Sequence, residues 1–210
     1  METDVTQEQS IKNAIAATVA EYGTLNVLLN CAGGSAVDDL TVHEMELEVF
    51  QRALTFNLVN PFLCCRYGIP HMIAAGGGSI VNVTSHTALM GSVRPAYAAA
   101  KGGVISFTKI LAAQYAEYGI RANAVAPGTI RSGRIIERYE NKEWQQANKT
   151  AAAARVASQK LYPFSFGEPS DIAAVALFLA SDESRMLTGT TIAAEGGRSS
   201  YLKIYASGEE

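Results

Sequence analysis

Short apolar runs alternate with longer amphipathic segments along this chain. Four of the runs are predicted to be strands, because they are rich in apolar or β-branched residues and end at glycine or polar residues. The first is apolar without alternation, which is typical of a strand in a parallel sheet covered on both faces. The four predicted strands are residues 25–30, 78–84, 120–126 and 191–194.

Hydrophobic spacing between these runs predicts helices over residues of about 6–22, 41–75, 95–118 and 167–181. Thr6–Gln9 and Thr41–Glu44 each have the sequence of a capping box, so we expect the first two helices to begin there. Gly23 and the run Gly76–Gly78 are expected to end them. Strands that alternate with helices in this way indicate an α/β fold.

Composition narrows the class of protein. The chain has 210 residues, 48% of them hydrophobic, and a net charge of -3, which fits one domain with a sizeable core and no basic surface for nucleic acid. No apolar run is long enough to span a membrane, so no membrane partner is expected. The three cysteines, Cys31, Cys64 and Cys65, show no metal-ligand spacing and are expected to be reduced in a cytoplasmic protein. The alternative for them is a catalytic thiol.

Tyr97 and Lys101 are the strongest candidates for chemistry. Both fall in the first turns of the helix predicted after Pro95, and at this i, i+4 spacing they share one face. A tyrosine with a pKa of roughly 10 is a poor proton-transfer group near neutral pH, and a nearby ammonium lowers that pKa by favouring the phenolate. The structural alternative is a half-buried ring beside a solvated charge.

Ordered motifs surround this pair. The strand end Asn82–Ser85 precedes it, and Asn123–Gly128 closes the next predicted strand. With these motifs the chain from Asp4 to Gly197 resembles the short-chain dehydrogenase/reductase family. The resemblance implies a Rossmann-like, doubly wound parallel sheet in three layers, in a single domain covering residues 1–210.

The resemblance also implies a catalytic set. Tyr97 would exchange a proton with the substrate, and Lys101 would lower the pKa of Tyr97 and hold the nicotinamide ribose. Ser85 would hydrogen-bond the substrate oxygen, and Asn57 would hold a water in the proton path. The implied activity is NAD(P)-dependent interconversion of a carbonyl and a secondary alcohol, as in a 3-oxoacyl reductase or an alcohol or sugar dehydrogenase. For Asn57 the alternative is a structural amide in the core.

Further residues are placed beside an NAD or NADP cofactor by the same resemblance. Asp4 and Val5 would lie near the adenine, and the turn Asn30–Gly33 would lie beside the adenosine half. Cys31 departs from the family, which usually has asparagine there. The turn after the 120–126 strand would contact the nicotinamide through its backbone, chiefly at Ile130. The expected cofactor-binding residues are Asp4, Val5, Asn30, Ala32, Gly33, Tyr97, Lys101, Pro127, Gly128 and Ile130.

Two expectations concern the surroundings of the site. Residues of about 131–166 change to a charge-rich helical composition, which predicts a helical substrate cap, with a solvated helical insert as the alternative. In the family, the helix 95–118 and the long helix before it build the main subunit contact. The resemblance therefore implies a homodimer or homotetramer acting on a small-molecule carbonyl or alcohol.

The front of the chain departs from the family pattern. No Gly-x-x-x-Gly-x-Gly turn occurs in it, so the fold is expected to be N-terminally truncated, with the first two strands of the family's sheet missing. The strand 25–30 would then be a bare sheet edge. Three explanations stay open: a fragment or misplaced start of a longer product, a short form whose partner covers the edge, and a catalytically impaired subunit that acts as a binding or scaffold protein. The residues that separate NAD from NADP belong to the missing part.

A metal-dependent hydrolase is an alternative from a different class. His43, His71 and His86 are scattered along the chain without a ligand spacing, so no metal site is expected. Ser85 and His86 are adjacent, and adjacent side chains on an extended segment point apart. A nucleophile activated by its neighbouring histidine is therefore disfavoured.

Overall fold

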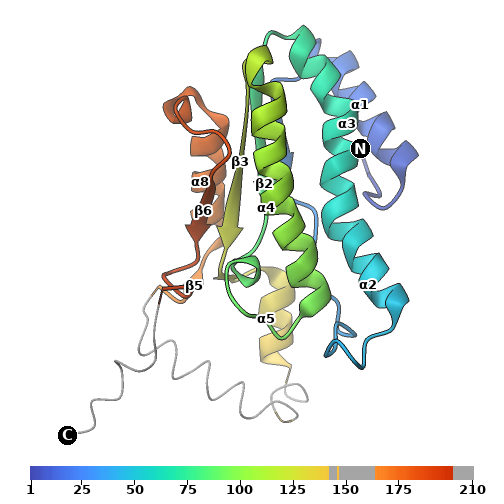
Figure 1. Ribbon diagram of the computed structural model, residues 1–210, viewed down its shortest axis with the longest axis vertical. Coiled ribbons are helices and arrows are strands. Elements are labelled where there is room, and N and C mark those ends of the chain that lie inside the picture. Colours follow the sequence, from blue (N-terminus) through green and yellow to red (C-terminus); the bar gives the residue numbers. More distant parts are fainter. Residues whose placement is uncertain (142–145, 147–163, 201–210) are drawn as a thin grey trace, which may run out of the picture.

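Four parallel strands form the centre of the protein (Figure 1). The computed structural model describes residues 1–141, 146 and 164–200. The sheet has the order β1-β2-β3-β6, and each neighbouring pair is parallel. The predicted parallel α/β sheet is confirmed, with strand bounds β1 Val27–Asn30, β2 Gly78–Val83, β3 Ile120–Pro127 and β6 Thr191–Ala194.

Helices cover both faces of this sheet, which confirms the three-layer prediction (Figure 1). On one face lie α1 (Glu8–Tyr22), α3 (Asn60–Ala74) and α4 (Pro95–Tyr115), and on the other lies α8 (Pro169–Ala180). Alternate residues of β2 serve the two faces: Ile80 packs in the cluster with α1, α3 and α4, and Val81 packs against α8. Successive side chains of a strand point to opposite faces, so one buried strand supports both layers.

The remaining elements connect these layers. The helix α2 (Leu47–Leu54) passes through a π-helical turn, η1 (Thr55–Val59), directly into α3. Beyond β2 and α4 lie the short 3₁₀ turns η2 (His86–Ala88) and η3 (Ala116–Tyr118), and η4 (Asp182–Ser184) follows α8. A small two-stranded sheet, β4 (Thr129–Ile130) and β5 (Phe166–Gly167), follows the end of β3. The helix α5 (Gly133–Glu140) comes between its strands in sequence.

Both predicted capping boxes are wrong. The N-cap of α1 is Gln7, without a side-chain cap, because the Thr6 hydroxyl donates to Asp4 instead. At the second site Thr41 bonds the Glu44 side chain and forms an isolated turn, and α2 begins only at Leu47. In both cases a local side-chain contact competes with helix initiation.

Among the strands that the structure describes, β1 pairs only with β2, so it lies at the edge of the sheet as predicted. Its two faces are covered unequally. Its inward residue Leu28 is 8% exposed, whereas Val27 and Leu29 on the other face are 46% and 49% exposed. The reason is that α8 packs mainly over β2 and β3. The cover on both faces expected for this apolar run is therefore wrong, because only the inward face of β1 is buried.

Part of the predicted cap at 131–166 falls outside the described residues. Residues 131–141, 146 and 164–166 are described, and they include α5 and the first residue of β5. Residues 142–145 and 147–163 lie outside the description. Among the described helices, none is long and apolar enough to cross a bilayer.

The two faces of β1 predict opposite mutational effects. We expect Leu28→Ala to lower the free energy of unfolding by about 2–5 kcal/mol, because it leaves a cavity in the core. Leu29→Ala is expected to cost less than about 1 kcal/mol, because that side chain is half exposed. Urea denaturation of both variants checks this, and equal losses would contradict the one-sided cover of β1.

Candidate active site

The first turns of α4 bring Tyr97 and Lys101 together, as predicted. Lys101 is only 3% exposed, and its Nζ donates a hydrogen bond to the Val83 carbonyl oxygen at 2.8 Å. The same Nζ lies 5.9 Å from the centroid of the half-buried Tyr97 ring. The amine is therefore fixed between the end of β2 and the phenol.

Burial governs the charge of Lys101. Loss of hydration lowers the pKa of its ammonium from 10.5 to about 8, with a smaller opposing contribution from the nearby Cys31. The group thus remains mostly protonated at neutral pH. A positive charge next to a phenol favours the phenolate, which is the electrostatic arrangement a proton-transferring tyrosine needs.

Ser85 stands where β2 ends, two residues beyond the carbonyl that holds Lys101. It is 6% exposed, and its Oγ accepts hydrogen bonds from the Thr87 backbone N–H at 3.3 Å and the Thr87 hydroxyl at 3.0 Å. Next to it, the Thr84 hydroxyl donates to the Lys101 backbone carbonyl at 2.7 Å. These bonds fix the strand end that carries Ser85 against α4.

Asn57 joins the cluster through the turn after β1. It is 1% exposed in the π-helical turn η1, where its Oδ1 accepts from Gly34 N at 2.9 Å and its Nδ2 donates to Gly34 O at 3.1 Å and Ala53 O at 3.0 Å. A Cβ on Gly33 would lie 2.8 Å from Asn57 Oδ1 and 2.9 Å from Lys101 Nζ. Only glycine leaves room for this approach. π-Helical turns of this kind are frequent at functional sites.

The other residues predicted to lie near the adenosine half of the cofactor do not form one cluster. The Asn30 amide is buried and donates to Asn82 Oδ1 at 2.8 Å, so this side chain serves the core. The Ala32 carbonyl accepts from Asn60 Nδ2 at 3.2 Å, which fixes the turn next to Gly33. Asp4 and Val5 lie before α1, outside the cluster, and the exposed Asp4 carboxylate accepts from Thr6 N and its hydroxyl.

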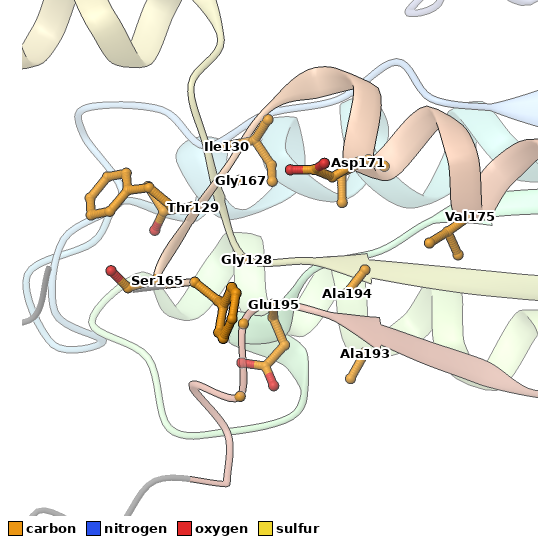
Figure 2. Close-up of a pocket in the computed structure, with 15 residues that line it drawn as sticks. Gly128, Thr129, Ile130, Ser165, Gly167, Asp171, Val175, Ala193, Ala194 and Glu195 are labelled. Carbon is orange, nitrogen blue, oxygen red and sulfur yellow. The ribbon is translucent and has the colours of Figure 1, made fainter. Parts of the chain in front are cut away.

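The turn after β3 borders a cavity of about 500 Å³ (Figure 2). Gly128 and Ile130, both predicted to contact cofactor, line it, and the neighbouring Pro127 carbonyl bonds the His86 ring at 3.0 Å. Figure 2 shows the cavity between α8, which carries Asp171 and Val175, and the end of β6. Its volume is that of a small-molecule site. The set that lines it from these elements includes Gly128, Thr129, Ile130, Ser165, Gly167, Asp171, Val175, Ala193, Ala194 and Glu195.

His86, Cys64 and Cys65 do not form a hydrolytic site. A carbonyl oxygen only accepts hydrogen bonds, so the His86 Nδ1 facing Pro127 carries the proton. The His86 ring therefore bonds the turn after β3 rather than Ser85. Burial lowers the pKa of His86. Burial also raises the pKa of the Cys64 thiol to about 11 and of Cys65 to about 12, which makes both poor nucleophiles. No group of metal-binding side chains occurs among the residues that the structure describes.

Sequence reasoning missed Asp39. Its carboxylate is buried and accepts hydrogen bonds from the backbone N–H groups of Ala96 and Tyr97, both at 3.0 Å. The sequence contains one signal for such a residue: α4 begins at Arg94-Pro95, without a Ser, Thr, Asp or Asn at its N-cap. Nothing in the sequence indicates that Asp39, rather than its neighbour Asp38, supplies the acceptor.

Comparisons with known proteins agree with this geometry. The family model described as enoyl-(acyl carrier protein) reductase matches residues 1–199. An oxidoreductase of Bacillus subtilis named YxbG, itself uncharacterized, is 38% identical over 200 residues, which are 94% of this chain and 71% of that protein. This chain belongs to the short-chain dehydrogenase/reductase family. The family comprises NAD(P)-dependent oxidoreductases.

Two solved structures of the short-chain dehydrogenase/reductase fold superpose closely. The ligand-free aldohexose dehydrogenase of Thermoplasma acidophilum has a TM-score of 0.86 and 30% identity, covering 100% of this chain and 81% of that one. ElxO, solved with NADP bound, has a TM-score of 0.84 and 30% identity, covering 96% of this chain and 78% of that one. The Rossmann-like fold predicted for this short-chain dehydrogenase/reductase is confirmed.

The buried amine of this short-chain dehydrogenase/reductase predicts a pH-dependent stability. Unfolded Lys101 keeps its proton up to 10.5, whereas folded Lys101 releases it near 8, so the unfolded state binds more protons between these values. The free energy of unfolding therefore rises with pH in this window, by at most about 1.4 kcal/mol per pH unit.

Urea denaturation of wild type and Lys101→Met across this window measures the effect as the difference between the two proteins. The exposed Lys109→Met of the same helix is the control and is expected to follow wild type. Parallel pH profiles for wild type and Lys101→Met would contradict a lowered pKa of Lys101.

Proposed function

We propose that the chain catalyses the reversible, NAD(P)-dependent interconversion of a carbonyl and a secondary alcohol on a small molecule. The observation that carries this proposal is the buried Lys101 ammonium, which lies 5.9 Å from the Tyr97 ring and bonds the last residue of β2, two residues before Ser85. The expected substrates are an alcohol, a sugar or a 3-oxoacyl group. A sugar is supported by the aldohexose dehydrogenase, which this fold resembles.

In this proposal each side chain has one task. The Tyr97 hydroxyl donates a proton to the carbonyl oxygen during reduction and takes it back from the alcohol during oxidation. The Lys101 ammonium makes this transfer easier by stabilising the phenolate. The Ser85 hydroxyl orients the substrate oxygen, and Asn57 orders a water through which the proton leaves the site. A well-placed acid-base group of this kind contributes about 10²–10⁴ in rate.

The residues present fit the nicotinamide half of an NAD or NADP cofactor. Lys101 offers an ammonium for the ribose hydroxyls beside Gly33, where the chain leaves no room for a side chain. The backbone of Pro127, Gly128 and Ile130 would face the carboxamide. The Asn30–Gly33 turn, with Ala32 exposed, would lie along the adenosine half, and Asp4 and Val5 near the adenine. When bound, the nicotinamide supplies the hydride chemistry, and the protein supplies orientation and electrostatics.

A second candidate function is a catalytically impaired subunit that acts as a binding or scaffold protein. The observation in its favour is the half-exposed apolar face of β1, with Val27 and Leu29 uncovered. Calorimetric titration with NADH and NADPH separates the two candidates. Binding of either cofactor supports the oxidoreductase, whereas a stable hetero-complex without cofactor binding supports the scaffold.

We also propose that the chain forms a homodimer or homotetramer in the cytoplasm. A cavity of about 340 Å³ lies between α3 and α4, next to the half-exposed Phe62 and lined also by Phe107 and Ile73. Apolar surface of this kind favours association with another chain. The free thiols of Cys31, Cys64 and Cys65 are consistent with a reducing compartment.

Tyr97→Phe is expected to lower kcat by about 10²–10⁴ while leaving the melting temperature nearly unchanged. The assay follows nicotinamide absorbance with D-glucose, a simple secondary alcohol and an acetoacetyl ester, in both directions and with both cofactors. Tyr118→Phe, a change at a more exposed tyrosine just after the same helix, is the control. Turnover by Tyr97→Phe at the wild-type rate would rule out the role of this phenol.

Phe62→Asp is expected to shift the oligomer towards monomer, because it places a charge in the proposed contact. Light scattering at several concentrations measures the mass. Leu177→Asp, at a 71% exposed position on α8, is the matched control and is expected to leave the mass unchanged. An unchanged mass for Phe62→Asp would exclude the α3–α4 surface as the contact.

A further inference from the structure

The N-terminus of α4, which carries Tyr97 and Lys101, receives no cap from its own segment. Its N-cap residue is Arg94, whose side chain makes no capping hydrogen bond. Pro95 has no N–H, and Ala98 N already donates to the Arg94 carbonyl at 2.9 Å. The N–H groups of Ala96 and Tyr97 therefore need acceptors from another part of the chain.

Asp39 supplies both acceptors. Its Oδ1 accepts from Ala96 N and its Oδ2 from Tyr97 N, each at 3.0 Å. The residue is 5% exposed, and its negative charge faces the positive end of the helix dipole. Its neighbour Asp38 instead forms an ion pair with Arg52 at the surface. Two adjacent aspartates on one loop thus have entirely different partners.

The loop that carries Asp39 is also a wall of the catalytic cluster. Gly33 approaches Lys101 Nζ, and Asn57 holds both the N–H and the carbonyl of Gly34. Further along the loop, the Arg94 guanidinium donates to the Ala36 carbonyl. Asp39 adds a further contact between this loop and α4, because it connects the end of the loop directly to the backbone of Tyr97. These contacts fix the position of Tyr97 relative to Gly33 and Gly34.

We propose that Asp39 is a positioning residue, which fixes Tyr97 relative to the Gly33–Gly34 wall in addition to capping α4. A cap from within the helix segment would stabilise α4 equally well, but it would leave the loop and Tyr97 unconnected. The capping contact stands on the distances alone. Its effect on turnover rests on the proposed function, so the two are tested by different measurements.

Amide hydrogen exchange tests the contact without any need for activity. Asp39→Asn keeps the shape of the side chain, but its amide presents an NH₂ where one acceptor stood. We expect faster exchange at Ala96 and Tyr97 in this variant, and wild-type exchange there in the control Asp38→Asn. Unchanged exchange at both amides in Asp39→Asn would overturn the proposal.

Turnover tests the positioning. A displacement of about 1 Å in a reacting group costs on the order of 10²-fold in rate. We expect Asp39→Asn to lose kcat to this extent with KM for the cofactor little changed, while Asp38→Asn retains the wild-type values. Absence of turnover in wild type with every substrate of the assay would contradict the proposed function, and the exchange result would then decide the role of Asp39 by itself.

A local cap separates positioning from simple helix stabilisation. Arg94→Ser places a hydroxyl at the N-cap, where it accepts from the amide of Ala96 or Tyr97. Relative to Asp39→Asn, the double variant Asp39→Asn/Arg94→Ser is expected to recover melting temperature and slow exchange. Its kcat is expected to stay about 10²-fold below that of Arg94→Ser alone.

Recovery of kcat together with stability would overturn the positioning role and leave Asp39 as a cap only. The double variant also keeps the test usable if Asp39→Asn by itself does not fold. Arg94→Ser alone is the required reference, because it removes the contact between Arg94 and the Ala36 carbonyl.

Discussion

The hydrogen bond from a buried ammonium to a strand-end carbonyl is the interaction on which the candidate active site depends. Removing a lysine from water is costly unless its charge finds partners. Lys101 finds one in the Val83 carbonyl oxygen at 2.8 Å, and the Tyr97 ring lies near by. The cost is visible in the lowered pKa of about 8, yet the amine keeps its proton at neutral pH. The fold thus holds a positive charge beside the phenol for which we propose a proton-transfer role.

The sheet and its polar bonds maintain this arrangement. Asn30 donates to Asn82, Asn82 donates to Thr108 on α4, and the Thr84 hydroxyl donates to the Lys101 backbone. These buried bonds connect β1, β2 and α4. A buried polar network whose members are all paired rigidifies a core and specifies one arrangement. Val83 and Ser85 consequently keep their positions relative to α4.

The four strands and the Tyr97–Lys101 pair could be predicted from local signals, and the three layers from the resemblance to the family. The apolar run at 25–30 indicates a parallel strand, but not that one of its faces stays half exposed, and i, i+4 spacing places two side chains on one helix face. The starts of the first two helices could not be predicted, because the Thr6 and Thr41 hydroxyls bond nearby carboxylates. Asp39 could not be predicted either, since its partners are far away in sequence and Asp38 has the same chemistry. Long-range contacts of this type leave only an indirect signal: a helix start without a cap.

A direct titration of the Lys101 side chain tests the central claim most sharply. Carbon-13 NMR of the lysine ε-methylene groups, with Lys101→Met used to assign the signal, gives the pKa of this one amine in the folded protein. The account predicts a titration near 8, with a simultaneous change in the Tyr97 ring signals. A titration near 10.5, or one that leaves the Tyr97 ring unaffected, would contradict it.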